Sequence, residues 1–240
     1  MESEGFTLSI GVCSGVLGCA SMLLLAGCGV TVHPQTNACG WTQEFKAANS
    51  QELAKIADFE SGIWTVDADG VITASKDSAI WLKGEYGDFQ LDFEYRLDPA
   101  ANSGVIIRCS DRRRWIPNSM EIQLLDDYAG KWAKDAPYLK CAGIYGHAAP
   151  TVQNVKPAGE WNRMTITAEG RRIRVAQNGL EVLDVDTSLW TSAKKNPDGT
   201  SIPSWLSRPI ADLSLAGRIG FQGLHGGARP YFRNVQIRSL

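Results

Sequence analysis

Residues 88–97 read Asp-Phe-Gln-Leu-Asp-Phe-Glu-Tyr-Arg-Leu, and this stretch decides the fold class. Polar and apolar residues alternate in it without a break. Because successive side chains of a strand point to opposite faces, the pattern predicts a strand with one face in a core and the other in water. Two more strand-like runs, 103–109 and 120–125, place Arg108, Glu121 and Gln123 where a one-sided sheet presents polar groups outward.

Length and charge exclude several classes of protein. The chain has 240 residues, and its 24 Lys and Arg against 26 Asp and Glu give a net charge of -2. The run Arg112–Arg114 is isolated and typical of a solvated loop, so we expect no nucleic-acid partner. With 24 glycines and 10 prolines, turns are frequent, as short antiparallel strands require. Without an N-terminal export segment, roughly 200 residues remain, enough for one sizeable all-β domain.

The N-terminus predicts export. Residues 10–28 are apolar and small, and they end in Leu25-Ala26-Gly27-Cys28, which is similar to the lipobox of bacterial lipoproteins, where the cysteine carries the lipid. The preceding residues contain no Lys or Arg, which is atypical of a signal. We predict a signal peptide at 1–28, a tether at 29–40 and a single β-sandwich domain at 41–240. The expected product is a cell-envelope lipoprotein, periplasmic or on the outer membrane, held to the membrane only through Cys28.

Three cysteines remain after such a signal is removed: Cys39, Cys109 and Cys141. An exported protein can form a disulfide, and Cys109 with Cys141 is then the favoured pair because both lie in the domain proper. The alternative is that both thiols are small buried hydrophobes. No CxxC or zinc-type spacing is present.

Turn signals divide the remainder into short strands. Asp69-Gly70 and Asn178-Gly179 are strong hairpin dipeptides, and Glu169-Gly170 is a further turn. Residues 43–59 fit either a helix or an extended lead-in, and long loops are expected at 126–156 and 188–211. About eleven short strands without a long helix predict an all-β, jelly-roll sandwich of two antiparallel sheets.

Several short blocks, in this order and spacing, carry a family resemblance. They are Tyr86–Leu91, Asn102–Val105, Glu121–Asp126, Gly143–Gly146, Pro157–Asn162, Asn178-Gly179, Gly220–Gly226 and Phe232–Val235. Together they cover about residues 63–240, and over this stretch the chain resembles the 3-keto-disaccharide hydrolase domain family. The resemblance implies a concanavalin A-like lectin/glucanase fold and a saccharide substrate, a glycoside already oxidised at C3.

The C3 ketone would make the C2 proton acidic, because the resulting carbanion is delocalised as an enolate. Loss of the C1 oxygen substituent then gives elimination, and water addition gives net hydrolysis. The route needs a base at C2, an acid for the leaving oxygen and donors at the C3 oxygen. An ordinary glycosidase instead needs two carboxylic acids across the bond; no such cluster is evident, and Gln123 stands where a second acid would be expected.

Three residues are candidates for catalysis. Glu121 shares the outer face of its strand with Gln123; the alternative is a solvated carboxylate. His225 lies among glycines that permit close backbone approach and suits proton transfer near neutral pH, or it is a surface histidine. Arg108, placed on the face of Ile106, would polarise a ketone or bind hydroxyls, or else form a cross-strand ion pair.

Further residues are candidates for substrate binding: Gln123, Asp127, Tyr145, His147, Gln222 and Trp132, with Trp115 and Trp205 as other loop tryptophans that could stack on sugar rings. No cofactor is certain. A divalent ion held by Glu121, Asp127, His147 and His225 is an open alternative, although no local ligand spacing supports it. The catalytic hypothesis requires residues 108, 121 and 225 to share one hollow. A second hypothesis is a non-catalytic, lectin-like glycan-binding module on the cell envelope, because fold alone does not decide function.

Overall fold

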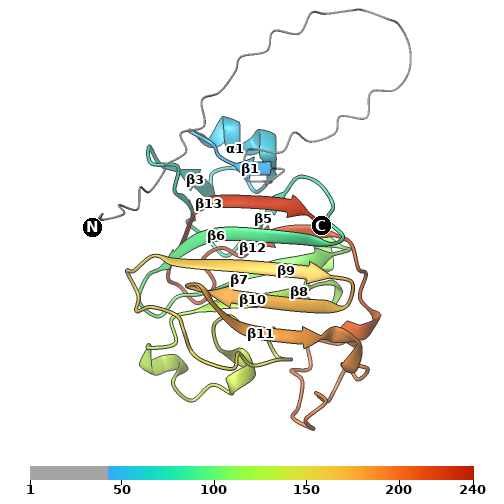
Figure 1. Cartoon of the computed structure of the whole chain (residues 1–240). Coiled ribbons are helices and arrows are strands. Elements are labelled where there is room, and N and C mark those ends of the chain that lie inside the picture. The colour runs from blue at the N-terminus through green and yellow to red at the C-terminus, as the bar shows by residue number, and fades with distance from the viewer. Residues whose placement is uncertain (1–42) are drawn as a thin grey trace, which may run out of the picture. The chain divides into compact units, whose positions relative to one another are not determined.

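The computed structural model describes residues 43–240, and these form two antiparallel sheets packed face to face (Figure 1). The strand expected from the alternating stretch is β6, Phe89–Leu97. Phe89, Leu91, Phe93 and Tyr95 are fully buried, as the alternation predicts. The expected all-β sandwich is confirmed. The predicted signal peptide and tether, with Cys28 and Cys39, lie outside the described residues.

The larger sheet has eight strands in the order β11-β10-β9-β6-β13-β4-β3, and β1 also pairs with β13 beside β4. Its strands are β1 Gln43–Phe45, β3 Trp64–Val66, β4 Ile72–Ala74, β6, β9 Asn162–Glu169, β10 Arg172–Gln177, β11 Leu180–Asp186 and β13 Pro230–Ser239. The polar face of β6 is part of its outer surface. There Asp92 is covered by Arg163 and Thr165, which both donate hydrogen bonds to its carboxylate.

The smaller sheet has five strands in the order β2-β5-β12-β7-β8 and carries the hollow described below. Its strands are β2 Ala57–Asp58, β5 Ile80–Leu82, β7 Asn102–Cys109, β8 Met120–Leu125 and β12 Arg218–Phe221. The register pairs Gly104 with Gln123 and Ile106 with Glu121. Thirteen strands in the described chain thus replace the eleven expected, and the additions are short strands near the N-terminal end.

The hairpin signals are confirmed. Asn178 and Gly179 join β10 to β11 with φ angles of 50° and 82°, the positive pair that an Asn-Gly turn adopts. Asp69-Gly70 lies between β3 and β4, and at Glu169-Gly170 strand β9 ends with Glu169 and Gly170 begins the turn into β10. Short 3-10 helices occupy loops at Arg112–Arg114, Ile116–Asn118, Gly130–Trp132, Pro137–Leu139, Thr187–Leu189 and Ile210–Asp212.

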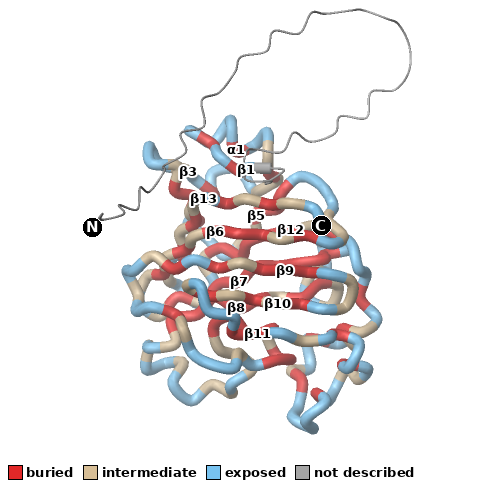
Figure 2. The backbone as a smooth tube through the Cα atoms, viewed as in Figure 1, coloured by how far each residue is buried: buried red, intermediate tan, exposed pale blue. Residues whose placement is uncertain are grey.

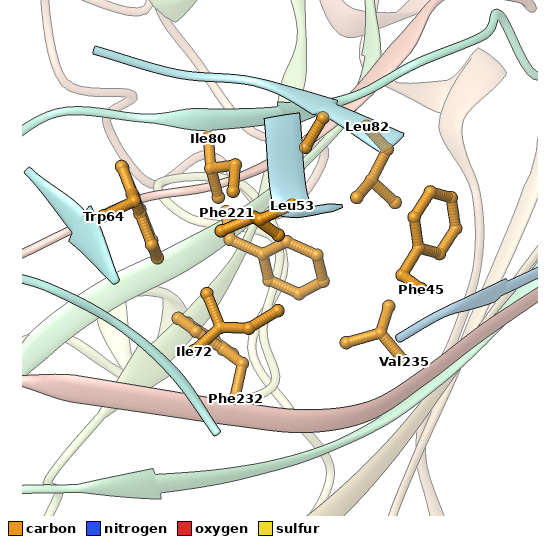
Figure 3. Close-up of a pocket in the computed structure, with 10 residues that line it drawn as sticks. Phe45, Leu53, Trp64, Ile72, Ile80, Leu82, Phe221, Phe232 and Val235 are labelled. Carbon is orange, nitrogen blue, oxygen red and sulfur yellow. The ribbon is translucent and has the colours of Figure 1, made fainter. Parts of the chain in front are cut away.

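The N-terminal lead-in is both extended and helical. After β1, helix α1 covers Ser50–Ile56, and the Asn49 side chain accepts a hydrogen bond from the Glu52 amide as its N-cap. Figure 3 shows Leu53 of α1 among apolar side chains from both sheets, where Phe221 and Phe232 also meet. A cavity of only about 10 Å³ remains there, lined by apolar side chains, so this region is closed core.

Burial follows the strands, and exposure follows the loops (Figure 2). Cys109 and Cys141 are buried free thiols, so the predicted disulfide is wrong and the alternative of small buried hydrophobes is confirmed. The Cys141 sulfur instead lies 3.3 Å from the Tyr95 hydroxyl. None of the helices in residues 43–240 is long and apolar enough to cross a membrane.

Candidate functional site

A hollow of about 270 Å³ lies on the outer face of the smaller sheet. Strand β8 forms part of the floor of the hollow. Its side chains alternate between the two faces of the sheet, so Ile122 and Leu124 point into the core while Glu121 and Gln123 face outward. The residues that line it are Asn102, Trp115, Ile116, Glu121, Gln123, Tyr145, Trp205, Leu206, Gln222 and His225. Glu121, His225, Gln123, Tyr145 and Gln222, all predicted from sequence, thus meet in one place.

Glu121 is the acidic group of the floor. Its side chain lies across Gly104 of β7, where an added Cβ would overlap the carboxylate. Glu121 is half-buried, and no protein donor among the described residues hydrogen-bonds its carboxylate. Burial, with a smaller contribution from the Asp77 carboxylate, raises the pKa of Glu121 to about 8. The carboxyl group is therefore mostly protonated at neutral pH and can donate a proton.

His225 is paired with an acid that sequence reasoning missed. Its Nδ1 lies 2.7 Å from Oδ2 of Asp77, and both side chains are about half exposed. Asp77 lies in the loop before β5, and His225 lies in the loop after β12. The Leu224 amide joins these two loops by donating to the Lys76 carbonyl at 3.0 Å. Gly223 allows this approach, because a Cβ there would meet the carbonyls of Lys76 and Ser78. Since a carboxylate can only accept, this contact favours the neutral tautomer of the imidazole with its proton on Nδ1, which leaves Nε2 free to accept a proton.

Amide side chains supply neutral hydrogen-bonding groups. Gln123 donates through Nε2 to Oδ1 of Asn102 at 3.2 Å. The buried Oε1 atoms of Gln123 and Gln222 have no partner in the described chain. Because buried acceptors are rarely left unpaired, these two oxygens are suited to accept hydrogen bonds from ligand hydroxyls.

Segment 142–145 adds a further edge beside β8. The Tyr145 amide donates to the Glu121 carbonyl at 2.9 Å, and the Gln123 amide donates to the Gly143 carbonyl at 3.0 Å. These bonds bring Tyr145 to the rim of the hollow. Burial and the nearby Glu121 raise the pKa of the Tyr145 phenol, which therefore remains a hydrogen-bond donor at neutral pH.

Two loops form the apolar walls. Trp115 and Ile116 come from the loop between β7 and β8, and Trp205 and Leu206 come from the loop before β12. The Arg208 guanidinium donates to Oδ1 of Asn118 at 2.5 Å, which ties the two loops together. This exposed hydrogen bond thus links the two walls.

Arg108 is not in the hollow, so the prediction that it shares this site is wrong. It has a φ of 54°, and the β7–β12 register shifts beside it. This irregularity breaks the parity that placed Arg108 with Ile106. The side chain is 1% exposed, and its Nη1 donates to the Gly170 carbonyl of the β9–β10 turn at 2.5 Å. Arg108 therefore links the two sheets, with Asp88 as its ion-pair partner at 3.6 Å, and burial lowers its pKa.

This placement predicts that Arg108 matters for stability rather than turnover. We expect Arg108→Ala to lower the free energy of unfolding by about 2–3 kcal/mol, because a buried charged hydrogen bond and the side-chain packing are both lost. Denaturant titration measures that change. The kcat of the folded variant should stay within about threefold of the wild type, and a loss of turnover at unchanged stability would contradict the structural role.

Three other predicted residues are also placed differently. Asp127 borders a separate hollow with Lys140 and Thr151, and burial raises its pKa to about 6. His147 is buried, with Nδ1 at 2.9 Å from the Tyr145 carbonyl, and burial lowers its pKa. Trp132 donates through Nε1 to the Ala100 carbonyl and packs near Gly226, at the margin of the site.

The four proposed metal ligands therefore do not converge. Within residues 43–240, no group of three His, Cys, Asp or Glu side chains is arranged to hold a metal ion. Asp77 and Asn102 are the polar residues that sequence reasoning missed, and Ile116 and Leu206 are the missed apolar ones. A loop Asp carries no local signal of pairing with a residue 148 positions away, whereas Asn102 preceded the predicted strand 103–109 and belonged to one of the family blocks.

The chain matches a known protein family and several solved structures. A model of the 3-keto-α-glucoside-1,2-lyase-like domain matches residues 35–238. A Parabacteroides distasonis crystal structure, provisionally classed as a glycosyl hydrolase, shares 48% identity with a TM-score of 0.75, covering 78% of this chain and 94% of that one. A second such structure from the same organism has 21% identity, a TM-score of 0.62 and coverage of 82% and 100%.

A more distant match shows only the fold. It is a Bacillus subtilis protein of unknown function with a galectin-like fold, 11% identical, with a TM-score of 0.50 and coverage of 82% and 98%. A comparison with curated proteins found no match. The family match covers most of the chain, including every residue of the hollow, and it confirms the resemblance seen in the sequence blocks. The chain belongs to the 3-keto-α-glucoside-1,2-lyase-like domain family.

Proposed function

We propose that this protein is a carbohydrate-active enzyme that cleaves glycosides whose C3 carbon is already a ketone. The observation that carries the proposal is that Glu121 and His225, the latter held by Asp77, line one hollow on the sheet, where burial raises the pKa of Glu121 to about 8. These are the acid and the base that elimination from a 3-keto-glycoside needs. The family description and the 48% identical glycosyl hydrolase relative support this substrate class.

The reaction divides between the two groups. His225 Nε2 takes the C2 proton, and the electron pair of the C2–H bond moves onto the C3 oxygen as an enolate. When the ketone re-forms, the C1–O bond breaks and a C1–C2 double bond is left in the sugar. Glu121 gives its proton to the departing oxygen, and the products are an alcohol and an unsaturated 3-keto sugar. Addition of water across that double bond would make the net reaction a hydrolysis.

The neutral side chains would orient the sugar. The free acceptors on Gln123 and Gln222 suit its hydroxyl groups, and the Tyr145 hydroxyl is a donor available to the C3 oxygen as charge develops there. A charged guanidinium is not required for this step, in keeping with the position of Arg108 between the sheets.

The decisive experiment compares a 3-keto-disaccharide with its unoxidised parent, using the purified protein. We expect turnover of the oxidised sugar only, with a primary isotope effect when C2 carries deuterium, because the C2–H bond breaks. Equal turnover of both sugars would assign the protein to the conventional glycosidases and reject the proposal.

A second candidate function is a glycan-binding module without catalysis. The exposed Trp205 and the unpaired amide oxygens would serve binding equally well. Calorimetry with saturable binding of the 3-keto sugar, but no product after long incubation, would favour this function.

Asp77→Asn tests the pairing with His225. The side-chain amide of this variant can donate a hydrogen bond to Nδ1 of His225, which favours the tautomer with the proton on Nε2. A protonated Nε2 can no longer take the C2 proton, so the base would be lost. We expect kcat to fall by about 10²–10⁴-fold with little change in KM, because neutralising an orienting acid removes general-base catalysis. Asp69→Asn, in the exposed β3–β4 turn, is the matched control and should leave kcat unchanged. Wild-type kcat in Asp77→Asn would show that the pair has no role.

We also propose that the chain is exported and lipidated at Cys28, on the lipobox-like Leu25-Ala26-Gly27-Cys28. Cys28→Ala should then move the protein from the membrane fraction to the soluble fraction of cells expressing the full chain. A variant that still fractionates with membranes would count against lipidation.

A further inference from the structure

The polar and apolar groups of the hollow lie at opposite ends of it, along strand β7. His225 forms a backbone β-bridge with Asn102 at one end, and the Gln222 amide donates to the Gly104 carbonyl in the middle. At the other end, Trp115 packs against the cluster that contains Ile106. Positions 102 and 106 are separated by about 13 Å at the usual rise of a strand. Polar groups therefore gather at the 102 end and apolar groups at the 106 end.

Glu121 lies between the two ends. It pairs with Ile106 across the β7–β8 ladder, and its carboxylate reaches over Gly104. In the proposed reaction this group protonates the leaving oxygen. The sugar then lies toward Asn102 and His225, and the aglycone, which is attached to that oxygen, lies toward Ile106 and Trp115.

The aglycone end is defined by four residues, which we call the apolar mouth: Trp115, Ile116, Trp205 and Leu206. Trp205 is 57% exposed and Ile116 is 40% exposed, so the mouth presents apolar surface to water beside a polar site. None of the four side chains offers a hydrogen-bond acceptor or a charge, and only the indole N–H groups can donate.

The mouth is also preorganised. Trp115 is packed against the small cluster of Trp81, Ile106 and Cys109. Leu206 is held beside Gly146 and Pro203, and the Arg208–Asn118 hydrogen bond joins the two walls. Side chains packed in this way lose little entropy on binding, and the indole faces suit a flat ring.

Building on the proposed function, we propose that the leaving group of the preferred substrate is a neutral, apolar, ring-bearing aglycone rather than a second sugar. A second sugar would stack one face on an indole ring, but none of the four side chains would accept a hydrogen bond from its hydroxyls. An aromatic ring would instead bury the exposed faces of Trp205 and Ile116. The substrate class is thus the 3-keto-glycosides of aromatic alcohols.

The test separates binding from leaving-group ability. Benzyl 3-keto-glucoside, methyl 3-keto-glucoside and a 3-keto-disaccharide all release alcohols, so none of them gains from an acidic phenol. We expect kcat/KM for the benzyl compound to exceed that for the disaccharide by roughly tenfold or more, an effect that burial of one ring can supply. A disaccharide turned over as well as the benzyl compound would overturn the inference and leave the proposed function standing.

Two variants test whether the apolar mouth causes the preference for the benzyl compound. In Trp205→Ala the ratio of benzyl to methyl kcat/KM should fall roughly tenfold. Leu189→Ala, which removes another exposed apolar side chain outside the hollow, should leave the ratio as in the wild type. An unchanged ratio in Trp205→Ala would place the aglycone elsewhere and reject the mouth.

If none of the three compounds is turned over, the proposed function fails. The inference about the apolar mouth is then tested by measuring the binding of unreactive ligands. Calorimetry with unoxidised benzyl and methyl glucosides needs no catalysis. Tighter binding of the benzyl glucoside that is lost in Trp205→Ala would support the apolar mouth, whereas equal binding of the two would overturn it.

Discussion

Glu121→Gln is expected to reduce turnover of a 3-keto-disaccharide by about 10²–10⁴-fold, the range in which general acid–base catalysis contributes. The amide keeps the shape of the side chain and a hydrogen-bond donor, but it has no proton to transfer to the leaving oxygen. The measurement is kcat on the purified variant at pH 7, where the wild-type carboxyl, with a pKa raised to about 8, is mostly protonated.

A better leaving group distinguishes an acid from a residue that merely binds. The 4-nitrophenyl 3-keto-glucoside releases a phenolate that needs no proton, so Glu121→Gln should lose less than about tenfold on this substrate. Equal losses on both substrates would remove the proton-donor role, and full activity on both would remove Glu121 from the mechanism. Glu60→Gln, at an exposed position away from the hollow, is the matched control and should behave as the wild type.

The raised pKa of Glu121 also predicts a loss of stability at high pH. The carboxyl binds its proton up to about pH 8 in the folded chain but only to its ordinary value of 4.5 when unfolded. The folded state therefore holds more protons across this window, and the free energy of unfolding falls as pH rises. The contribution is fully present below the unfolded pKa and lost once pH passes the folded one.

We expect the wild type to lose about 2–4 kcal/mol relative to Glu121→Gln between pH 5 and pH 9, because one pKa unit corresponds to about 1.4 kcal/mol. Urea titrations of both proteins at pH 5, 7 and 9 measure the difference. Glu60→Gln should follow the wild type at every pH. Parallel curves for the wild type and Glu121→Gln would mean that the carboxyl titrates as an ordinary exposed one.

Local patterns were sufficient for the strands and the turns. The alternation at 88–97 specifies β6, because a period of two leaves only one face for the core. Asn178-Gly179 specifies a hairpin, because both residues accept positive φ. The same parity rule correctly turned Glu121 and Gln123 outward on β8.

The rule failed where backbone geometry departs from the regular strand. Arg108 adopts a positive φ beside a register shift, and its side chain consequently points toward Gly170 rather than into the hollow. No residue type at 108 or its neighbours announces this irregularity. Likewise, the presence of Cys109 and Cys141 in one exported domain favoured a disulfide, whereas the fold keeps both thiols free and buried.

The amino-acid order alone was enough for an all-β sandwich, its family blocks and an outward carboxyl on β8, because each depends on neighbours a few positions apart. The assembly of the site depended on contacts across the whole chain. Asp77 meets His225 only because β5 and β12 lie side by side, which brings their flanking loops together. The acidity of Glu121 likewise follows from burial by distant loops, an environment that no local stretch of residues encodes.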